Sequence, residues 1–103
     1  MSLKKKYLKS KPVCKVTFNL PKDEVAGGKQ VALVGEFNNW KPKKADHMRK
    51  LKNGTFTKTI DLEVGKSYQF RYLIDGETWV NDPAADAYVS SGVSHEENCI
   101  VTV

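Results

Sequence analysis

Apolar and polar residues alternate along several short stretches of the chain, and turn-forming residues separate these stretches. Residues 14–20 and 68–74 carry apolar side chains at every second position. Because successive side chains of a strand point to opposite faces, this pattern predicts strands with one face in a core. Asn53 and Gly54 lie between two further extended stretches within residues 48–62, and this dipeptide readily forms a tight hairpin turn.

No stretch carries a sustained helical period, and turn residues recur about every 8–12 residues. In a chain of 103 residues, this spacing favours one domain folded as an antiparallel β-sandwich or a small barrel. Residues 31–34 are apolar throughout, as in a central strand that is covered on both faces. We further expect a turn at residues 75–76, short strands at Trp79 and over residues 99–103, and a single helical turn over residues 84–88.

The net charge of +5 is concentrated near the start of the chain. The first 11 residues carry five lysines and no acidic residue, whereas residues 12–103 carry 12 basic and 12 acidic residues. We therefore expect a flexible basic tail over residues 1–11 and one folded module over residues 12–103. A basic tail can contact nucleic acid or another acidic surface. The neutral body and the lack of a known nucleic-acid-binding motif argue against a nucleic-acid partner.

The chain shows no sign of a membrane or a secretory segment. No uncharged apolar run approaches the roughly 18 residues that a membrane span needs, and no apolar stretch follows the first lysines, so we expect a cytoplasmic protein. Cys14 and Cys99 form no Cys-x-x-Cys pair, and His47 and His95 lack the spacing of metal ligands, so neither a metal nor another cofactor is expected. Two buried free thiols are the expectation in a reducing cytoplasm, with a disulfide on oxidation as the alternative.

Motifs of known catalytic sites are absent from the sequence. It contains no Gly-x-Ser-x-Gly elbow, no phosphate-binding glycine loop and no plausible pair of histidine and cysteine. Asp75, Glu77, Asp82 and Asp86 are close in sequence, but a glycosidase must hold two carboxylates across a cleft. Asp75 and Asp82 are better explained as turn formers, because each precedes a glycine or a proline. We therefore do not expect an enzyme.

Aromatic and polar residues in or beside the predicted turns remain as candidates for binding. Trp40 and Trp79 can each be a lid on the core or a flat platform for a ligand. Hydrogen-bonding groups are supplied by Asn38, Asn39, Arg71 and Asn98. An indole fits the apolar C–H face of a pyranose, and polar side chains fit its hydroxyl rim. Together these residues suit a polyhydroxylated ligand.

Five stretches of the sequence resemble the motifs of the family 48 carbohydrate-binding modules. They are residues 31–40 (VALVGEFNNW), residues 68–76 (YQFRYLIDG), Trp79, residues 81–83 (NDP) and residues 98–101 (NCIV). This family includes the N-terminal early-set domain of isoamylases and branching enzymes, and the glycogen-binding domain of the AMP-activated protein kinase β subunit. The resemblance runs from about Val13 to Val103. It implies an immunoglobulin-like sandwich that binds α-1,4-linked glucans such as glycogen and starch, without catalytic activity.

The resemblance also implies roles for individual residues. Trp40 and Trp79 are similar to the two tryptophans that stack on sugar rings. Arg71 stands where the kinase-type modules carry a lysine that bonds sugar hydroxyls, and arginine can still donate with a forked geometry. Asn98 is similar to an asparagine that bonds sugar hydroxyls. Val93 is the candidate for the loop side chain that wedges into the curved glucan, where the kinase-type modules have a leucine.

The expected partner is therefore an α-glucan polysaccharide or oligosaccharide, bound by a free-standing module. The alternative is a domain of the same fold that has lost sugar binding and mediates protein–protein contacts as an adaptor. In that case its partner would be a separate glycogen-metabolising enzyme or regulator. Neither nucleic acid nor a membrane is expected as a partner.

Overall fold

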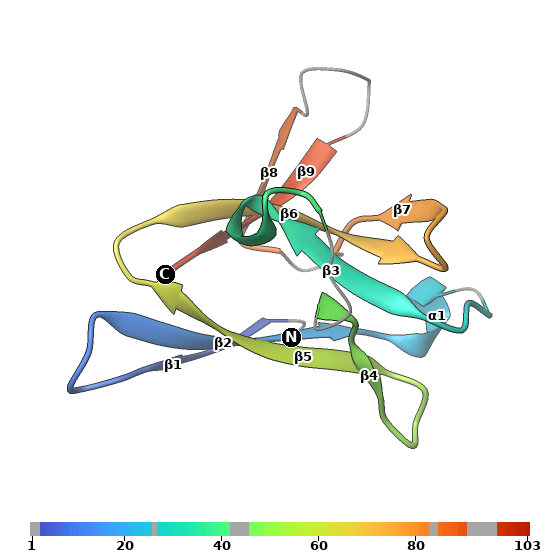
Figure 1. Cartoon of the computed structure of the whole chain (residues 1–103), viewed down its shortest axis with the longest axis horizontal. Helices are drawn as coiled ribbons and strands as arrows, with labels where there is room; N and C mark the ends of the chain where they lie inside the picture. Colours follow the sequence, from blue (N-terminus) through green and yellow to red (C-terminus); the bar gives the residue numbers. More distant parts are fainter. Residues whose placement is uncertain (1–2, 26, 42–45, 83–84, 91–96) are drawn as a thin grey trace.

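A computed structural model describes residues 3–25, 27–41, 46–82, 85–90 and 97–103, which form two antiparallel β-sheets packed face to face (Figure 1). Sheet A has the strand order β1 (Leu3–Tyr7), β2 (Val13–Leu20), β5 (Phe56–Glu63) and β4 (Arg49–Lys50). Sheet B has the order β3 (Val31–Gly35), β6 (Ser67–Ile74), β9 (Glu97–Thr102) and β8 (Ala87–Ser90), and β7 (Thr78–Val80) also pairs with β6. A short helix, α1 (Lys22–Val25), follows β2, and a 3-10 turn, η1 (Glu36–Asn38), follows β3. The predicted β-sandwich is confirmed.

The core lies between the sheets and is built by the alternating residues of β2 and β6. The inward side chains of β2 are buried, and so are those of β6 from Phe70 to Ile74. Phe18 of β2 packs edge-on against Phe70 of β6, with ring centroids 5.0 Å apart, and Phe70 packs in the same way on Tyr72. Such aromatic pairs add to the stabilisation from burial itself. The predicted inward and outward faces of both strands are therefore confirmed.

Strand β6 occupies the centre of sheet B and pairs along both of its edges. On one edge it faces β3. On the other edge, residues 67–70 pair with β9 and residues 72–74 pair with β7, so these two strands follow one another along the same side of β6. The outward side chains of β6 therefore lie between three neighbouring strands.

Strand β3 is completely buried but is not a central strand of the ladder. All five of its residues are buried, as the apolar run of residues 31–34 predicts. The strand order nevertheless places β3 at the edge of sheet B. The segment before β4 covers this edge, because Ala32 forms a bridge with His47 and the Met48 amide donates to the Val31 carbonyl at 2.7 Å. A loop therefore takes the place of a neighbouring strand along this edge, while Val31 and Leu33 pack in the core.

The lysine-rich start of the chain differs from the predicted tail. Leu3–Tyr7 form β1, which pairs with β2 along five residue positions. Leu3 lies opposite Phe18 and is 8% exposed, whereas Lys4 and Lys6 are exposed. Lysine is a common device on edge strands, where its charge discourages pairing with other chains. Residues 3–7 are therefore part of sheet A in the structure.

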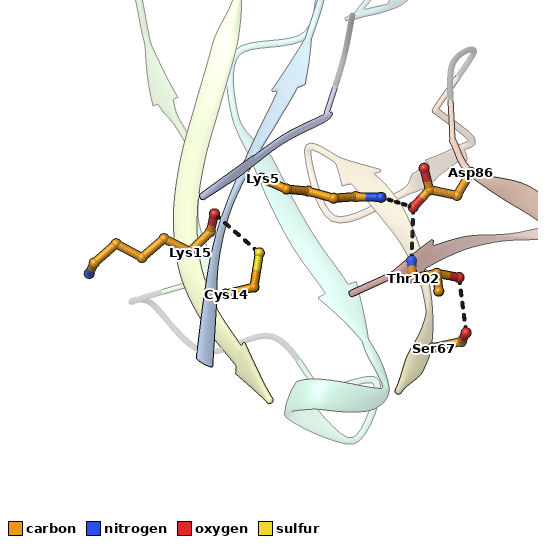
Figure 2. A network of polar contacts seen from close by, with 6 residues as sticks. All are labelled: Lys5, Cys14, Lys15, Ser67, Asp86 and Thr102. Carbon is orange, nitrogen blue, oxygen red and sulfur yellow. Dashed lines mark hydrogen bonds and ion pairs between the residues drawn. The ribbon is translucent and has the colours of Figure 1, made fainter. Parts of the chain in front are cut away.

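An ion pair also connects β1 to the other sheet (Figure 2). The Lys5 ammonium lies 2.6 Å from Oδ2 of Asp86, just before β8, and this oxygen also accepts a hydrogen bond of 2.8 Å from the Thr102 amide. The Thr102 hydroxyl contacts the Ser67 hydroxyl at 2.9 Å. Polar contacts therefore continue from β1 to β9 and β6.

The turns follow the predicted residues, while one predicted helical turn is wrong. Gly54 and Gly76 have φ angles of +89° and +72°, in the region that favours glycine. Asp75 has a φ of +52°, and its Oδ1 accepts hydrogen bonds from the amides of Lys29 and Gln30 at 3.0 and 2.8 Å. Within the predicted helical turn over residues 84–88, the last two residues belong to β8, because pairing with β9 prevails over a weak local preference. No helix among the described residues has the length and apolar character to cross a membrane.

Candidate functional site

The outer face of sheet B gathers the predicted site residues of β6 and β7. Residues that lie opposite one another on neighbouring strands share a face. Leu73 lies opposite Trp79, Val34 lies opposite Arg71, and Gln69 lies opposite Ile100. Alternate residues of β6 point away from the core, so these residues all belong to the outer face. Trp79 is 40% exposed there.

Arg71 and Trp79 are in direct contact. The Arg71 guanidinium carbon lies 5.6 Å from the centre of the Trp79 ring system, which is within the range of a cation–π interaction. Nε of Arg71 donates to Oδ1 of Asn81 at 3.2 Å, and Nδ2 of Asn81 donates to the Glu97 carbonyl at 2.8 Å. This chain of contacts joins β6, the end of β7 and the start of β9. It presents an indole beside a set of hydrogen-bond donors.

Asn98 extends the same face toward β9. Its side chain is 9% exposed, and its Nδ2 donates to Oε1 of Gln69 at 3.0 Å. Asn98 directly precedes Cys99, which lies opposite Phe70, so it neighbours the Arg71 position across the sheet. Gln69 and Asn81 were not predicted as site residues. The alternation of β6 places Gln69 beside Arg71. Asn81, by contrast, is recognised as a site residue only from its hydrogen bond with Arg71.

The structure holds Trp40 away from this contact, at the end of β3. Its amide donates to the Gly35 carbonyl at 2.9 Å, and Gly35 lies opposite Phe70. The backbones of Trp40 and Trp79 therefore flank β6 from opposite sides, about three residues or ~10 Å apart along the strand. Trp40 is half-buried. The predicted site residue Val93 lies outside the described residues.

Asn38 shapes the turn before Trp40 and is already occupied by the backbone. Its Oδ1 accepts from the Gly35 amide at 3.0 Å, and its Nδ2 donates to the Leu33 carbonyl at 2.9 Å. Asn39 and Trp40 then adopt φ angles of +56° and +61°, which turn the chain sharply. The amide of Asn38 therefore closes the η1 turn, and its role as a ligand-bonding group stays a prediction.

A buried carboxylate anchors the end of β7 behind this face. Asp82 is fully buried, and its Oδ2 accepts from the Tyr72 hydroxyl at 2.7 Å. The Asp82 carbonyl accepts from the Tyr88 hydroxyl at 2.6 Å, and its amide donates to the Cys99 sulfur at 3.0 Å. Burial raises the pKa of Tyr72 well above its usual value, and the neighbouring Asp82 raises it further. Asp82 is therefore more than the turn former that its neighbour Pro83 suggests.

The buried thiol of Cys99 leads to a testable expectation. Both cysteines are free and buried, and burial raises the pKa of Cys99 from 9.0 to about 11. The thiolate is the reactive form, so at pH 8 its population falls about a hundredfold relative to an ordinary thiol. In a Cys14→Ala variant, where Cys99 is the single thiol, we expect an aromatic disulfide reagent to react at least about a hundredfold more slowly with the folded protein than in urea. Equal rates would contradict the buried, protonated state.

Comparison with known proteins identifies the family. A family model described as the glycogen recognition site of AMP-activated protein kinase matches residues 24–101, from α1 through β9. The chain belongs to this family. Members of the glycogen-recognition family with similar sequences include the AMP-activated protein kinase subunit beta-1 of Sus scrofa, 39% identical over 66 residues, which are 62% of this chain and 48% of that protein. The beta-2 subunit of Homo sapiens is 38% identical over 65 residues, which are 62% of this chain and 22% of that protein. The chain thus spans less than half the length of these relatives.

A solved structure shows the fold independently of the sequence. The enterobactin esterase FES from Shigella flexneri matches 99% of this chain with a TM-score of 0.74, over 33% of the esterase chain. The sequence identity is 10%, so this likeness concerns the fold alone. The sandwich of the glycogen-recognition family is thus shared with a chain of very different sequence.

Proposed function

We propose that this module binds α-1,4-linked glucans on the outer face of sheet B, without catalysing a reaction. The observation that carries the proposal is the contact between Arg71 and the exposed indole of Trp79 on the outer face of sheet B. An indole can cover the apolar face of a glucose ring, while a guanidinium beside it can donate to the ring's hydroxyl groups. Membership of the glycogen-recognition family supports a glucan as the ligand.

The remaining residues suggest how a glucan of several units would lie. Asn98 and Gln69 place two amides next to Arg71, on the side of β9. We propose Trp40 as a second platform, on the opposite side of β6 from Trp79. A glucan that contacts both tryptophans would therefore cross β6 over Arg71. This places the most versatile hydrogen-bond donor at the middle of the ligand.

The direct test is binding of the purified chain to maltoheptaose, insoluble starch and glycogen. One indole on a sugar face removes on the order of 100 Å² of apolar area, or roughly 2.5 kcal/mol before the cost of association. We expect a dissociation constant of roughly 10 μM to 1 mM by calorimetry. Because the glucan is neutral, raising the salt from about 50 to 200 mM should leave the affinity nearly unchanged, unlike binding to nucleic acid. No heat at millimolar maltoheptaose would contradict the proposal.

An open depression on the outer face of sheet A favours a second role as an adaptor. It has a volume of about 510 Å³ and lies on the opposite layer of the sandwich from Arg71. Among the described residues its lining has basic side chains and hydroxyl groups and no acidic residue: Lys4, Thr17, Asn19, His47, Arg49, Leu51, Thr57, Lys58 and Thr59. Such a surface suits an acidic protein partner. The relatives are named as subunits of a protein kinase, which supports a kinase assembly as that partner.

A further inference from the structure

Asn81 uses both ends of its side-chain amide, and this fixes its orientation. Oδ1 accepts from Nε of Arg71, and Nδ2 donates to the Glu97 carbonyl. Arginine can only donate and a carbonyl can only accept, so the opposite orientation of the amide would place like groups against each other. One conformation of Asn81 therefore satisfies both neighbours.

The backbone that carries Asn81 is itself held in place. On one side, Val80 pairs with Tyr72 in the ladder between β6 and β7. On the other side, Asp82 is fully buried and bonded to Tyr72, Tyr88 and Cys99. The amide of Asn81 therefore projects from a rigid point of the fold toward Arg71.

Arginine has a long side chain that loses considerable rotamer freedom when it is ordered. In this structure the guanidinium already lies over Trp79, with Nε directed at Asn81. A ligand that meets Arg71 in this position does not need to order it again, which favours affinity.

We propose that Asn81 is a positioning residue for glucan binding, which holds the Arg71 guanidinium against the indole of Trp79. This inference rests on the proposed function, because it concerns the same face. Asn81 need not touch the glucan itself. It acts by keeping Arg71 in the orientation in which the arginine and the indole present one continuous surface.

Nitrogen-15 NMR of the arginine side chains tests the first half of the proposal without a ligand. The chain has two arginines, Arg49 and Arg71, so the two Nε–H signals are readily assigned, and the exposed Arg49 serves as a reference. In the wild-type protein we expect the Arg71 Nε–H to exchange with water about five- to tenfold more slowly than that of Arg49. In Asn81→Ala this protection should be largely lost, whereas Asn81→Asp should keep part of it, since a carboxylate still accepts from Nε but can no longer donate to the Glu97 carbonyl.

Maltoheptaose affinity tests the second half. We expect Asn81→Ala to weaken binding about three- to tenfold, and Asn81→Asp to weaken it less, because the carboxylate keeps the bond to Nε and loses only the one to the Glu97 carbonyl. Asn53→Ala is the matched control, because the Asn53 side chain also accepts a hydrogen bond, in this case from the Thr55 amide, but lies in the exposed turn between β4 and β5. Melting curves of each variant show whether the fold is intact.

Two results would overturn the inference. Unchanged Arg71 exchange in Asn81→Ala would show that Asn81 does not hold the guanidinium. A changed exchange rate with wild-type affinity would show that the orientation does not serve binding. If the wild-type protein binds no glucan, the proposed function fails, and the exchange measurement still decides whether Asn81 positions Arg71.

Discussion

The Trp79→Ala variant should lose detectable retention on starch while it remains folded. The indole is 40% exposed and lies over the outer face of sheet B, so its removal takes away ligand contact more than core packing. Losing roughly 2 kcal/mol from a weak complex raises its dissociation constant about thirtyfold. The free energy of unfolding should fall by less than about 1.5 kcal/mol, against 3–5 kcal/mol for a buried tryptophan. Thermal unfolding and starch retention, measured on the same sample, show whether the Trp79 indole contacts the ligand or packs in the core.

Two further variants sharpen this result. Tyr7→Ala removes an aromatic side chain that is 56% exposed on β1 of the other sheet, and it should retain starch like the wild type. Trp40→Ala should also lose retention, but with a greater loss of stability, because Trp40 is half-buried. A Trp79→Ala protein that unfolds early and still holds starch would end the assignment of this indole as a platform.

Removal of residues 1–8 should strongly destabilise the module. The truncation deletes β1, its five paired positions along β2, the buried Leu3 and the ion pair between Lys5 and Asp86. A buried leucine alone is worth about 2–5 kcal/mol when it is truncated to alanine. We expect a loss of about 3 kcal/mol and a melting temperature lower by roughly 10–20 °C. Differential scanning calorimetry of the two chains provides the measurement.

Point variants separate the contributions to this loss. Leu3→Ala should reproduce most of it, because the ion pair of Lys5 is partly exposed and such pairs contribute little. Lys4→Ala is the control, since this neighbouring side chain is exposed on the outer face of the same strand. An unchanged melting temperature after truncation would show that β1 adds nothing to the stability of the sandwich.

The sequence predicts best those strands that have one buried and one exposed face. The alternation of residues 14–20 and 68–74 identifies β2 and β6, since their pattern follows directly from the two faces of a sheet. Strand β1 escapes prediction for a physical reason. Edge strands are protected by charge, so Lys4, Lys5 and Lys6 have the composition of a solvated tail, and a single leucine carries the burial. Strand β8 is missed because pairing with β9, rather than local pattern, defines it.

The candidate site shows a similar division. Arg71 and Trp79 belong to motifs that the sequence displays, and the structure brings them into contact. Gln69 follows from the alternation of β6, whereas Asn81 is identified by its hydrogen bonds to Arg71 and to the Glu97 carbonyl, which the sequence does not reveal. Asn38 shows the reverse case. Its side chain looks available for a ligand in the sequence, but in the structure it is hydrogen-bonded to the backbone of its own turn.

The position of β6 between β3 on one edge and β7 and β9 on the other has a consequence for the lifetime of the site. Arg71 pairs with β3 on one edge, and the residues on either side of it in β6 pair with β9 and β7 on the other edge, so the strand around it is held by three neighbours. Segments of this kind exchange their amide protons with solvent through global rather than local opening. Any ligand that binds only the folded form therefore stabilises the whole module by the same free energy that it gains at this strand. The face that we propose for glucan binding should thus persist for as long as the fold itself.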